Sequence, residues 1–327
     1  MAGSVSPSSF HHRYDRVNGI RYHYVDEGPK HGPTVLLMHG FPDLWYGWRH
    51  QIKFLAGQGY RVICPDLRGY GQTDSPHSPP IDIRTYGVKS VADDMLKILD
   101  RNHVDKFVVI GHDWGGYLAW RLSLFYPSRL LGVGSFSTPY FPATKGFEPL
   151  ETIVKKMPSL SYQLVFRKPE SDQYFDDHAE LILRGFYQRN RPQDDVVGFM
   201  KHIHMLPPDA KNVQPSPSNF TTEADIKYYI DQYTRRGFHG GLNYYRTTQV
   251  NWEDTRELSS KINIPALMVT SGHDPVLPQQ LTAHMPQFIP HLTQRHIQNS
   301  SHWILLEQPD LANLYIAEFL ESLPLKT

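Results

Sequence analysis

Short apolar runs bounded by glycine and proline recur along this chain and alternate with stretches of helical periodicity. Five runs are apolar at nearly every position, as a strand covered on both faces would be: residues 34–38, 61–64, 107–110, 130–135 and 266–270. Strands of a parallel sheet have this continuous pattern, whereas a half-exposed strand alternates between apolar and polar residues. We therefore predict a mostly parallel sheet, with a further strand around residues 294–297.

Helices are predicted between these strands. Residues 86–101 carry apolar side chains at helical spacing, and residues 114–125 form a second helical stretch. An N-terminal hairpin over residues 13–25 is expected around Asn18-Gly19, because this dipeptide supplies the two positive φ angles of a type I′ turn. Strand and helix alternate up to about residue 138 and again from about residue 262, which is typical of a doubly wound α/β sheet.

The segment between these two α/β regions has a different pattern. It contains no apolar run of the strand type and is rich in tyrosine, phenylalanine, proline and charged residues. Helical stretches are predicted at residues 178–187 and 224–236. We therefore expect an α/β core made of residues 1–138 and 256–327, with residues 139–255 inserted into it as a helical lid, or cap, domain.

Composition and charge narrow the class of protein. The 327 residues contain 33 Lys+Arg and 33 Asp+Glu, so the zero net charge gives no support for binding nucleic acid or an anionic membrane. No apolar run approaches the roughly 20 residues of a membrane helix, and the termini lack a signal peptide and the peroxisomal S-K-L address. The single cysteine, Cys64, is expected to be a buried strand residue. These observations predict a soluble cytoplasmic protein.

The stretch GHDWGG, from Gly111 to Gly116, has the outline of a nucleophile elbow, which is a sharp turn between a strand and a helix. A predicted strand precedes it and a predicted helix follows it, and its glycines remove side chains that would clash in a tight turn. The usual form is G-x-S-x-G, but the central residue here is Asp113. An aspartate in such a turn commonly caps a helix, so Asp113 alone does not indicate catalysis.

Two further residues complete the order of a catalytic triad. Asp274 follows the strand 266–270, and His302 follows the strand around 294–297. The order nucleophile, acid, histidine is that of the α/β-hydrolases. We therefore expect an α/β-hydrolase fold, a mostly parallel sheet flanked by helices, in which Asp113, Asp274 and His302 meet at the ends of three strands.

A turn with the sequence HGFP follows the strand 34–38, where this architecture provides part of an oxyanion hole. The backbone N–H groups of Phe41 and of Trp114, the residue after Asp113, are the expected donors. The HGFP sequence is also compatible with a simple tight turn.

An aspartate nucleophile suits one kind of reaction. A serine oxygen that opened an epoxide or displaced a halide would form an ether, which water does not readily cleave. A carboxylate forms an ester instead, and activated water can hydrolyse it. Asp113 is expected to be ionised near neutral pH without help, because the ordinary pKa of aspartate is about 3.9. His302, oriented by Asp274, is then expected to take a proton from water.

The chain resembles the soluble epoxide hydrolases of the α/β-hydrolase superfamily over essentially its whole length. The similar segments are HGFPDLWYGWRHQ, PDLRGYGQTDSP, GHDWGG, PALMVTSGHDPVLP and SHW, together with SYQLVF and GGLNYYR in the predicted lid. The resemblance implies that Tyr162 and Tyr245 hydrogen-bond the epoxide oxygen. Tyr244 competes with Tyr245, and only one of them is expected to face the pocket because helix neighbours point about 100° apart.

The resemblance further implies an epoxide hydrolase that makes vicinal diols from lipophilic epoxides, aryl or fatty-acid derived, through a covalent aspartyl ester. Phe41 and Trp114 are expected to contact the substrate alongside the two tyrosines, and no cofactor or metal is expected. The phosphatase domain that precedes the hydrolase in mammalian soluble relatives is not expected here.

Two other functions remain open from the sequence. Haloalkane dehalogenases also place a tryptophan after the nucleophile to hold halide, so Trp114 is compatible with that activity. A non-catalytic receptor for a small apolar ligand could keep the lid and pocket, but it would not need all three triad residues. The pair His202 and His204 could bind a metal, although a His-x-His pair is more typical of a solvated surface.

Overall fold

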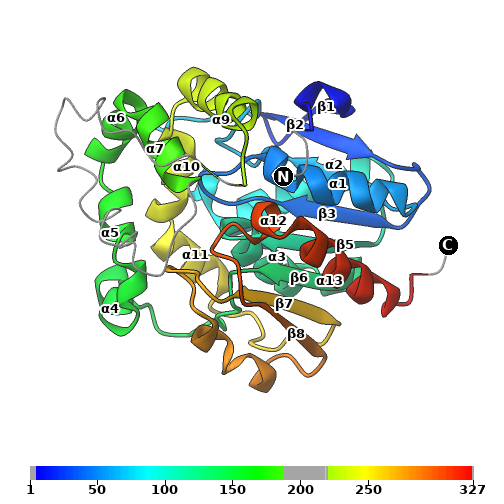
Figure 1. Cartoon of the computed structure of the whole chain (residues 1–327). Helices are drawn as coiled ribbons and strands as arrows, with labels where there is room; N and C mark the ends of the chain where they lie inside the picture. The colour runs from blue at the N-terminus through cyan, green and yellow to red at the C-terminus, as the bar shows by residue number, and fades with distance from the viewer. Residues whose placement is uncertain (1–4, 188–217, 219, 326–327) are drawn as a thin grey trace.

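The centre of the molecule is an eight-stranded sheet (Figure 1). The structure is a computed structural model, and it describes residues 5–187, 218 and 220–325. Its strands are β1 (His12–Val17), β2 (Ile20–Glu27), β3 (Thr34–Met38), β4 (Arg61–Pro65), β5 (Phe107–His112), β6 (Leu130–Phe136), β7 (Ala266–Ser271) and β8 (Leu292–Ile297). They lie in the order β1-β2-β4-β3-β5-β6-β7-β8. β2 runs antiparallel to β1 and β4, and the neighbours from β4 to β8 are parallel. The predicted α/β-hydrolase sheet is therefore confirmed.

The burial of whole strands explains why they could be predicted from the sequence. Every residue of β3, β4, β5 and β7 is buried, which requires the continuous apolar pattern. The N-terminal hairpin is also confirmed: Val17 pairs with Ile20, and Asn18 and Gly19 have φ angles of 47° and 83°.

Two pairs of helices cover the sheet. In one pair α2 (Val88–Arg101) packs against α3 (Trp114–Phe125), and in the other α1 (Arg49–Gly57) packs against α13 (Pro309–Glu321). Figure 1 shows α1 and α13 in front of the strands. The helix expected from residue 86 begins two residues later, because Gly87 has an extended backbone with φ −62° and ψ 148°.

The chain between β6 and β7 forms a group of short helices. These are α4 (Leu150–Lys156), α5 (Gln163–Phe166), α6 (Glu170–Asp177), α7 (Ala179–Phe186), α9 (Glu223–Arg236), α10 (His239–Asn243) and α11 (Thr248–Thr255). α7 and α9 correspond to the two helical stretches predicted there, and they pack against each other. Figure 1 shows the group gathered at one end of the sheet. His202 and His204 lie outside the described residues.

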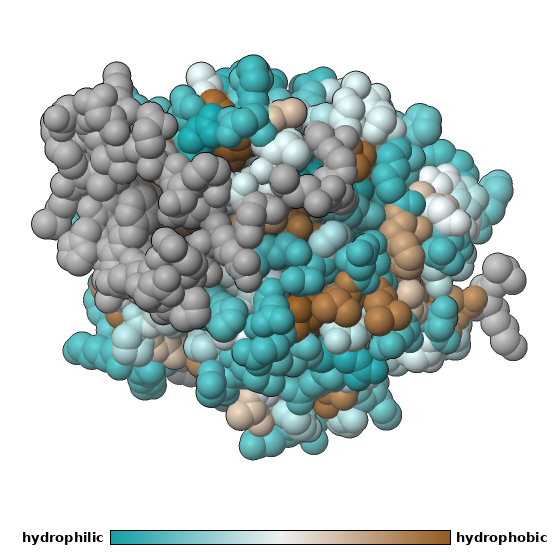
Figure 2. Space-filling view, in the orientation of Figure 1, coloured by the Kyte–Doolittle hydropathy of each residue, from teal (hydrophilic) through white to brown (hydrophobic). Residues whose placement is uncertain are grey.

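The surface in Figure 2 is mainly hydrophilic, apart from a band of hydrophobic residues in the region of α13. Leu311 and Leu314 on that helix are 37% and 47% exposed. Within the described part of the chain, no helix has the length and apolar character needed to cross a membrane.

Candidate active site

Asp113 stands on a strained turn between β5 and α3. Its φ of 54° and ψ of −122° are unusual for a residue with a side chain. The turn is possible because the neighbouring glycines leave room: a Cβ on Gly111 would lie 2.0 Å from the Gly115 carbonyl oxygen, and one on Gly115 would lie 2.1 Å from that of Met38. The elbow geometry inferred from GHDWGG is therefore present.

Backbone N–H groups of two residues hold the Asp113 carboxylate. Phe41 donates a hydrogen bond to Oδ1 with an N–O distance of 2.8 Å, and the N–H of Trp114 also bonds the carboxylate. Gly40 permits this approach, because a Cβ there would lie only 2.2 Å from Oδ1. Both expected oxyanion donors thus contact the carboxylate of Asp113, and the Phe41 N–H is directed at Oδ1.

Asp274 and His302 join Asp113 at the same end of the sheet. His302 Nδ1 lies 2.8 Å from Asp274 Oδ2, and His302 Nε2 lies 3.7 Å from Asp113 Oδ2. The other oxygen of Asp274 accepts hydrogen bonds of 2.9 Å from the backbone N–H groups of Val276 and Leu277. These contacts fix the orientation of the imidazole ring, with Nε2 directed at Asp113.

The triad is buried, and its charges depend on one another. Burial would lower the pKa of His302, but the carboxylates of Asp274 and Asp113 raise it to about 9. Burial raises the pKa of Asp113, opposed by His302 and by the N–H groups of Phe41 and Trp114. For Asp274, burial is outweighed by His302 and two backbone N–H groups, so its pKa is lowered. A protonated His302 beside Asp113 favours the charged form of this carboxyl, and the ionisation of Asp113 near neutral pH stays a prediction.

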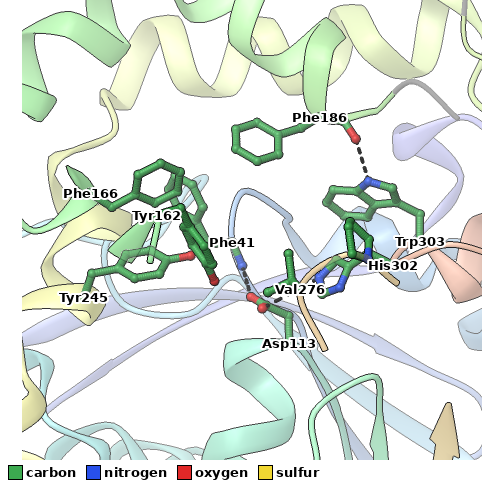
Figure 3. A pocket seen from close by; sticks show the side chains of 10 residues that line it. Phe41, Asp113, Tyr162, Phe166, Phe186, Tyr245, Val276, His302 and Trp303 are labelled. Carbon is green, nitrogen blue, oxygen red and sulfur yellow. Dashed lines mark hydrogen bonds and ion pairs between the residues drawn. The ribbon is translucent and has the colours of Figure 1, made fainter. Parts of the chain in front are cut away.

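Two tyrosines face Asp113 across a small cavity of about 40 Å³. Tyr162 precedes α5, and Tyr245 lies in the single turn Tyr244–Arg246 that follows α10. Their ring centroids are 5.9 Å apart, and Figure 3 shows both hydroxyls pointing toward the carboxylate. Burial raises the pKa of both phenols, so both stay protonated. Tyr244 points elsewhere, since its hydroxyl donates to the Arg68 carbonyl oxygen at 3.1 Å.

A larger cavity of about 370 Å³ is also lined by Asp113 and Tyr162. Trp114 contributes to this cavity, whereas Phe41 lines the smaller one. The size falls within the range of small-molecule binding pockets, about 300 to 1,000 Å³. A substrate with its reacting carbon at Asp113 therefore has room to extend into the larger cavity.

Sequence reasoning missed several residues around the triad. Trp303 lines the small cavity, and its Nε1–H donates to the Phe186 carbonyl oxygen at 2.5 Å (Figure 3), which ties the core to α7. Trp303 directly follows His302 in SHW, so its position beside the triad was a usable signal. Phe166, Phe186 and Val276 also line the cavity, but an isolated apolar residue gives no sequence signal for this role.

Asp43 is a second buried carboxyl that the sequence did not single out, although it ends the segment HGFPD. It accepts hydrogen bonds from the hydroxyls of Tyr187 and Tyr229, at 3.2 and 2.8 Å. Burial raises its pKa to about 6 despite these hydrogen bonds. Asp43 therefore links the loop after β3 to α9 and to the residue after α7. Over the described parts of the chain, no cluster of three His, Cys, Asp or Glu side chains is arranged to hold a metal ion.

Comparison with known proteins places this site in a family. The model of the alpha/beta hydrolase fold matches residues 33–309. Bifunctional epoxide hydrolase 2 of Sus scrofa is 36% identical over 98% of this chain, which spans 57% of the pig protein, little more than half its length. Epoxide hydrolase srdG of Neurospora crassa is 34% identical, with 95% of each chain covered. The crystal structure of epoxide hydrolase A from Mycobacterium thermoresistibile has a TM-score of 0.87 and 31% identity, covering 97% of this chain and 100% of that one.

Proposed function

We propose that this chain, which belongs to the α/β-hydrolase fold family and within it to the epoxide hydrolases, hydrolyses lipophilic epoxides to vicinal diols. The observation that carries the proposal is the position of Asp113. One carboxylate oxygen is held by the Phe41 N–H, and two tyrosines line the same small cavity. A carboxylate nucleophile opposite two hydroxyl donors is what opening a neutral three-membered ring needs.

In the first step, Oδ2 of Asp113 attacks an epoxide carbon, and the bond from that carbon to the ring oxygen breaks. The ring oxygen leaves as a basic alkoxide that Tyr162 and Tyr245 hydrogen-bond, and one of the two transfers its proton to this oxygen and becomes a phenolate. The product of this step is an ester between Asp113 and a hydroxyalkyl group. Oδ1 becomes the ester carbonyl oxygen at the N–H of Phe41, and the N–H of Trp114 is the second proposed donor to the oxyanion that forms next.

Before the second step, the proton on His302 passes through solvent to the tyrosine phenolate. Neutral His302 then takes a proton from water as the water oxygen attacks the ester carbonyl carbon. Collapse of the tetrahedral intermediate breaks the bond between that carbon and the alkyl oxygen, and the proton held by His302 passes to the departing diol. The proton of the resulting Asp113 carboxylic acid then returns to His302, which restores the starting state. Ester formation prepares this step, because it removes the Asp113 charge that helps to raise the pKa of His302. His302 thereby becomes a better base when its base function is needed.

We further propose that residues 139–255 act as a lid that supplies the two tyrosines and most of the larger cavity wall. Apolar and aromatic residues of this segment favour lipophilic substrates, with aryl or fatty-acid derived epoxides as the expected classes. The division into a core of residues 1–138 and 256–327 and this lid places the reacting centre at their boundary.

The test is turnover of trans-stilbene oxide by a variant in which both Tyr162 and Tyr245 are changed to phenylalanine. We expect loss of ester formation and of diol, with the melting temperature retained within a few degrees. Tyr244→Phe is the matched control, because its hydroxyl contacts the Arg68 carbonyl oxygen and lines neither cavity. Normal turnover in the double variant would exclude the proposed acid role.

A haloalkane dehalogenase remains the second candidate, because Trp114 lines the larger cavity beside Asp113. Displacement of a halide by Asp113 would form the same kind of ester. The halide leaves as a stable anion, so it would need no proton from a tyrosine. Release of chloride or bromide from haloalkanes, with no diol from epoxides, would favour that activity.

A further inference from the structure

The larger cavity contains a buried cation, Arg121, that the proposed reaction does not use. Three side chains on one face of α3 line this cavity in succession, namely Trp114, Tyr117 and Arg121. Their spacing of three and four residues places them along a single stripe of the helix. The stripe begins beside Asp113, which precedes the first residue of α3.

Arg121 is only 4% exposed, and its contacts are all uncharged. One Nη donates to the Phe141 carbonyl oxygen at 2.9 Å, and the other lies 3.4 Å from the Tyr117 hydroxyl. Its buried Nε has no hydrogen-bond partner among the described residues. Tyr140 also contacts the group, with its ring centre 6.0 Å from the guanidinium carbon. A guanidinium has five N–H donors in a planar fork, and these uncharged contacts do not use all of them.

The other buried arginines show that this arrangement is exceptional. Arg61 pairs with Asp26 at 3.0 Å, Arg68 pairs with Asp94, and Arg49 lies 3.5 Å from Asp225. Arg121 has no ion pair with any of the described residues. A buried charge without a counter-ion is costly, so its retention points to an anion that binds there.

Besides Asp113, one acidic side chain among the described residues lines the cavity, and it does not serve as the counter-ion of Arg121. Glu148 lines the same cavity, but it pairs with Lys156, another lining residue. The side chains of Glu148 and Lys156 are 36% and 66% exposed, so this pair lies toward solvent. Arg121 is therefore the buried cation of the cavity wall, while the Glu148–Lys156 pair is already neutralised.

The helix geometry sets the distance between the cation and the nucleophile. Arg121 is eight residues after Asp113, which corresponds to about 12 Å along α3. The guanidinium carbon lies 4.8 Å from the centre of the Tyr117 ring, so the side chain leans back toward Asp113. Leu160, Met157 and Ile153 line the same cavity. The cavity thus combines a nucleophile, an apolar wall and a cation.

We propose that Arg121 binds the carboxylate of an anionic substrate whose epoxide lies several methylene groups from that carboxylate, as in a long-chain epoxy fatty acid. Arg121 would then be a specificity-determining residue that positions the epoxide over Asp113. This inference rests on the proposed epoxide hydrolase function. A carboxylate fits the guanidinium fork with two parallel hydrogen bonds, and the apolar wall covers the methylene chain.

The test compares kcat/KM for oleic acid epoxide with that for oleyl alcohol epoxide, below their micelle concentrations. The two compounds have the same hydrocarbon chain and the same epoxide. They differ only in the terminal group, which is a carboxylate in the acid and a hydroxyl in the alcohol. The wild-type protein should prefer the acid by about tenfold to a hundredfold, the range expected for hydrogen bonds to a charged group. Arg121→Gln should remove this preference by lowering the value for the acid only, and Arg121→Lys should restore part of it.

Two controls separate this inference from the proposed function. Lys156→Gln removes a cation from the exposed part of the same cavity and should leave the preference within about threefold. Stilbene oxide has no carboxylate, so Arg121→Gln should lower kcat/KM for oleic acid epoxide at least tenfold more than it lowers kcat/KM for stilbene oxide. A wild-type protein that is inert on every epoxide would contradict the proposed function itself. Equal hydrolysis of acid and alcohol by the wild type would overturn the role of Arg121, whether or not its variants fold.

Discussion

Replacing Gly40 by alanine tests whether the geometry around Asp113 is needed for catalysis. The added Cβ would lie 2.2 Å from Asp113 Oδ1, whereas ordinary van der Waals contact begins near 3.4 Å. The carboxylate oxygen must therefore move by about 1.2 Å. Its hydrogen bond from the Phe41 N–H is 2.8 Å long, and a shift of this size takes it beyond hydrogen-bonding range.

The expected result is a large loss of rate with a moderate loss of stability. Removal of one oxyanion donor lowers kcat by about a hundredfold to a thousandfold in known cases. Overpacking at a tight site costs about 1 to 3 kcal/mol of the free energy of unfolding. Gly40 does not have a positive φ, so alanine adds no backbone strain. The assay is the initial rate of diol formation from stilbene oxide, with urea denaturation measured on the same samples.

Gly57→Ala is the matched control, because a Cβ at this last residue of α1 would meet nothing within 4 Å. It should keep the wild-type kcat and stabilise the helix by up to about 1 kcal/mol. A Gly40→Ala protein whose kcat stays within about threefold of the wild type would refute the reasoning, since the Asp113–Phe41 contact would then be dispensable.

Further predictions concern single groups in and around the site. Tyr245→Phe should lower the rate of ester formation from stilbene oxide by about a hundredfold or more, whereas Tyr244→Phe should leave it near the wild-type value in stopped-flow measurements. The pKa of His302 is raised from 6.5 to about 9, so protonated His302 stabilises the folded state. This contribution is complete below about pH 6.5 and is lost as the pH rises through 9. The difference in unfolding free energy between the wild type and His302→Gln should accordingly shrink by a few kcal/mol between about pH 6 and pH 10. The pKa of Asp43 is raised from 3.8 to about 6, so its ionisation destabilises the fold as the pH rises through this interval. Denaturation of Asp43→Asn should lack that pH-dependent loss, and an identical pH dependence in the two proteins would contradict the assignment.

The sheet and the order of the triad could be predicted because they depend on local and repetitive features. Strands buried on both faces must be apolar throughout, and the sharp turn at Asp113 needs glycines that the sequence displays. The carboxyl ends of parallel strands share one edge, so residues after β5, β7 and β8 were expected to meet there. The distances from His302 to Asp113 and Asp274 agree with that expectation.

Other features depend on tertiary packing and could not be read from the chain. Tyr244 and Tyr245 are adjacent and equally buried, so only the fold separates the one that faces Asp113 from the one that bonds the Arg68 carbonyl. The raised pKa of Asp113 results from its burial, which only the folded chain creates. Arg121 gave no signal, because an arginine on a helix is normally exposed, and its isolation in a cavity wall is visible only in three dimensions.

The covalent aspartyl ester is the central claim, and the intact mass of the His302→Gln protein after mixing with stilbene oxide tests it most directly. Without the base the ester should form but not hydrolyse, so the protein should gain the mass of one epoxide. The same experiment with an Asp113→Asn, His302→Gln double variant should give no gain. An unchanged mass for His302→Gln, while the wild-type protein turns over the epoxide, would contradict the ester mechanism.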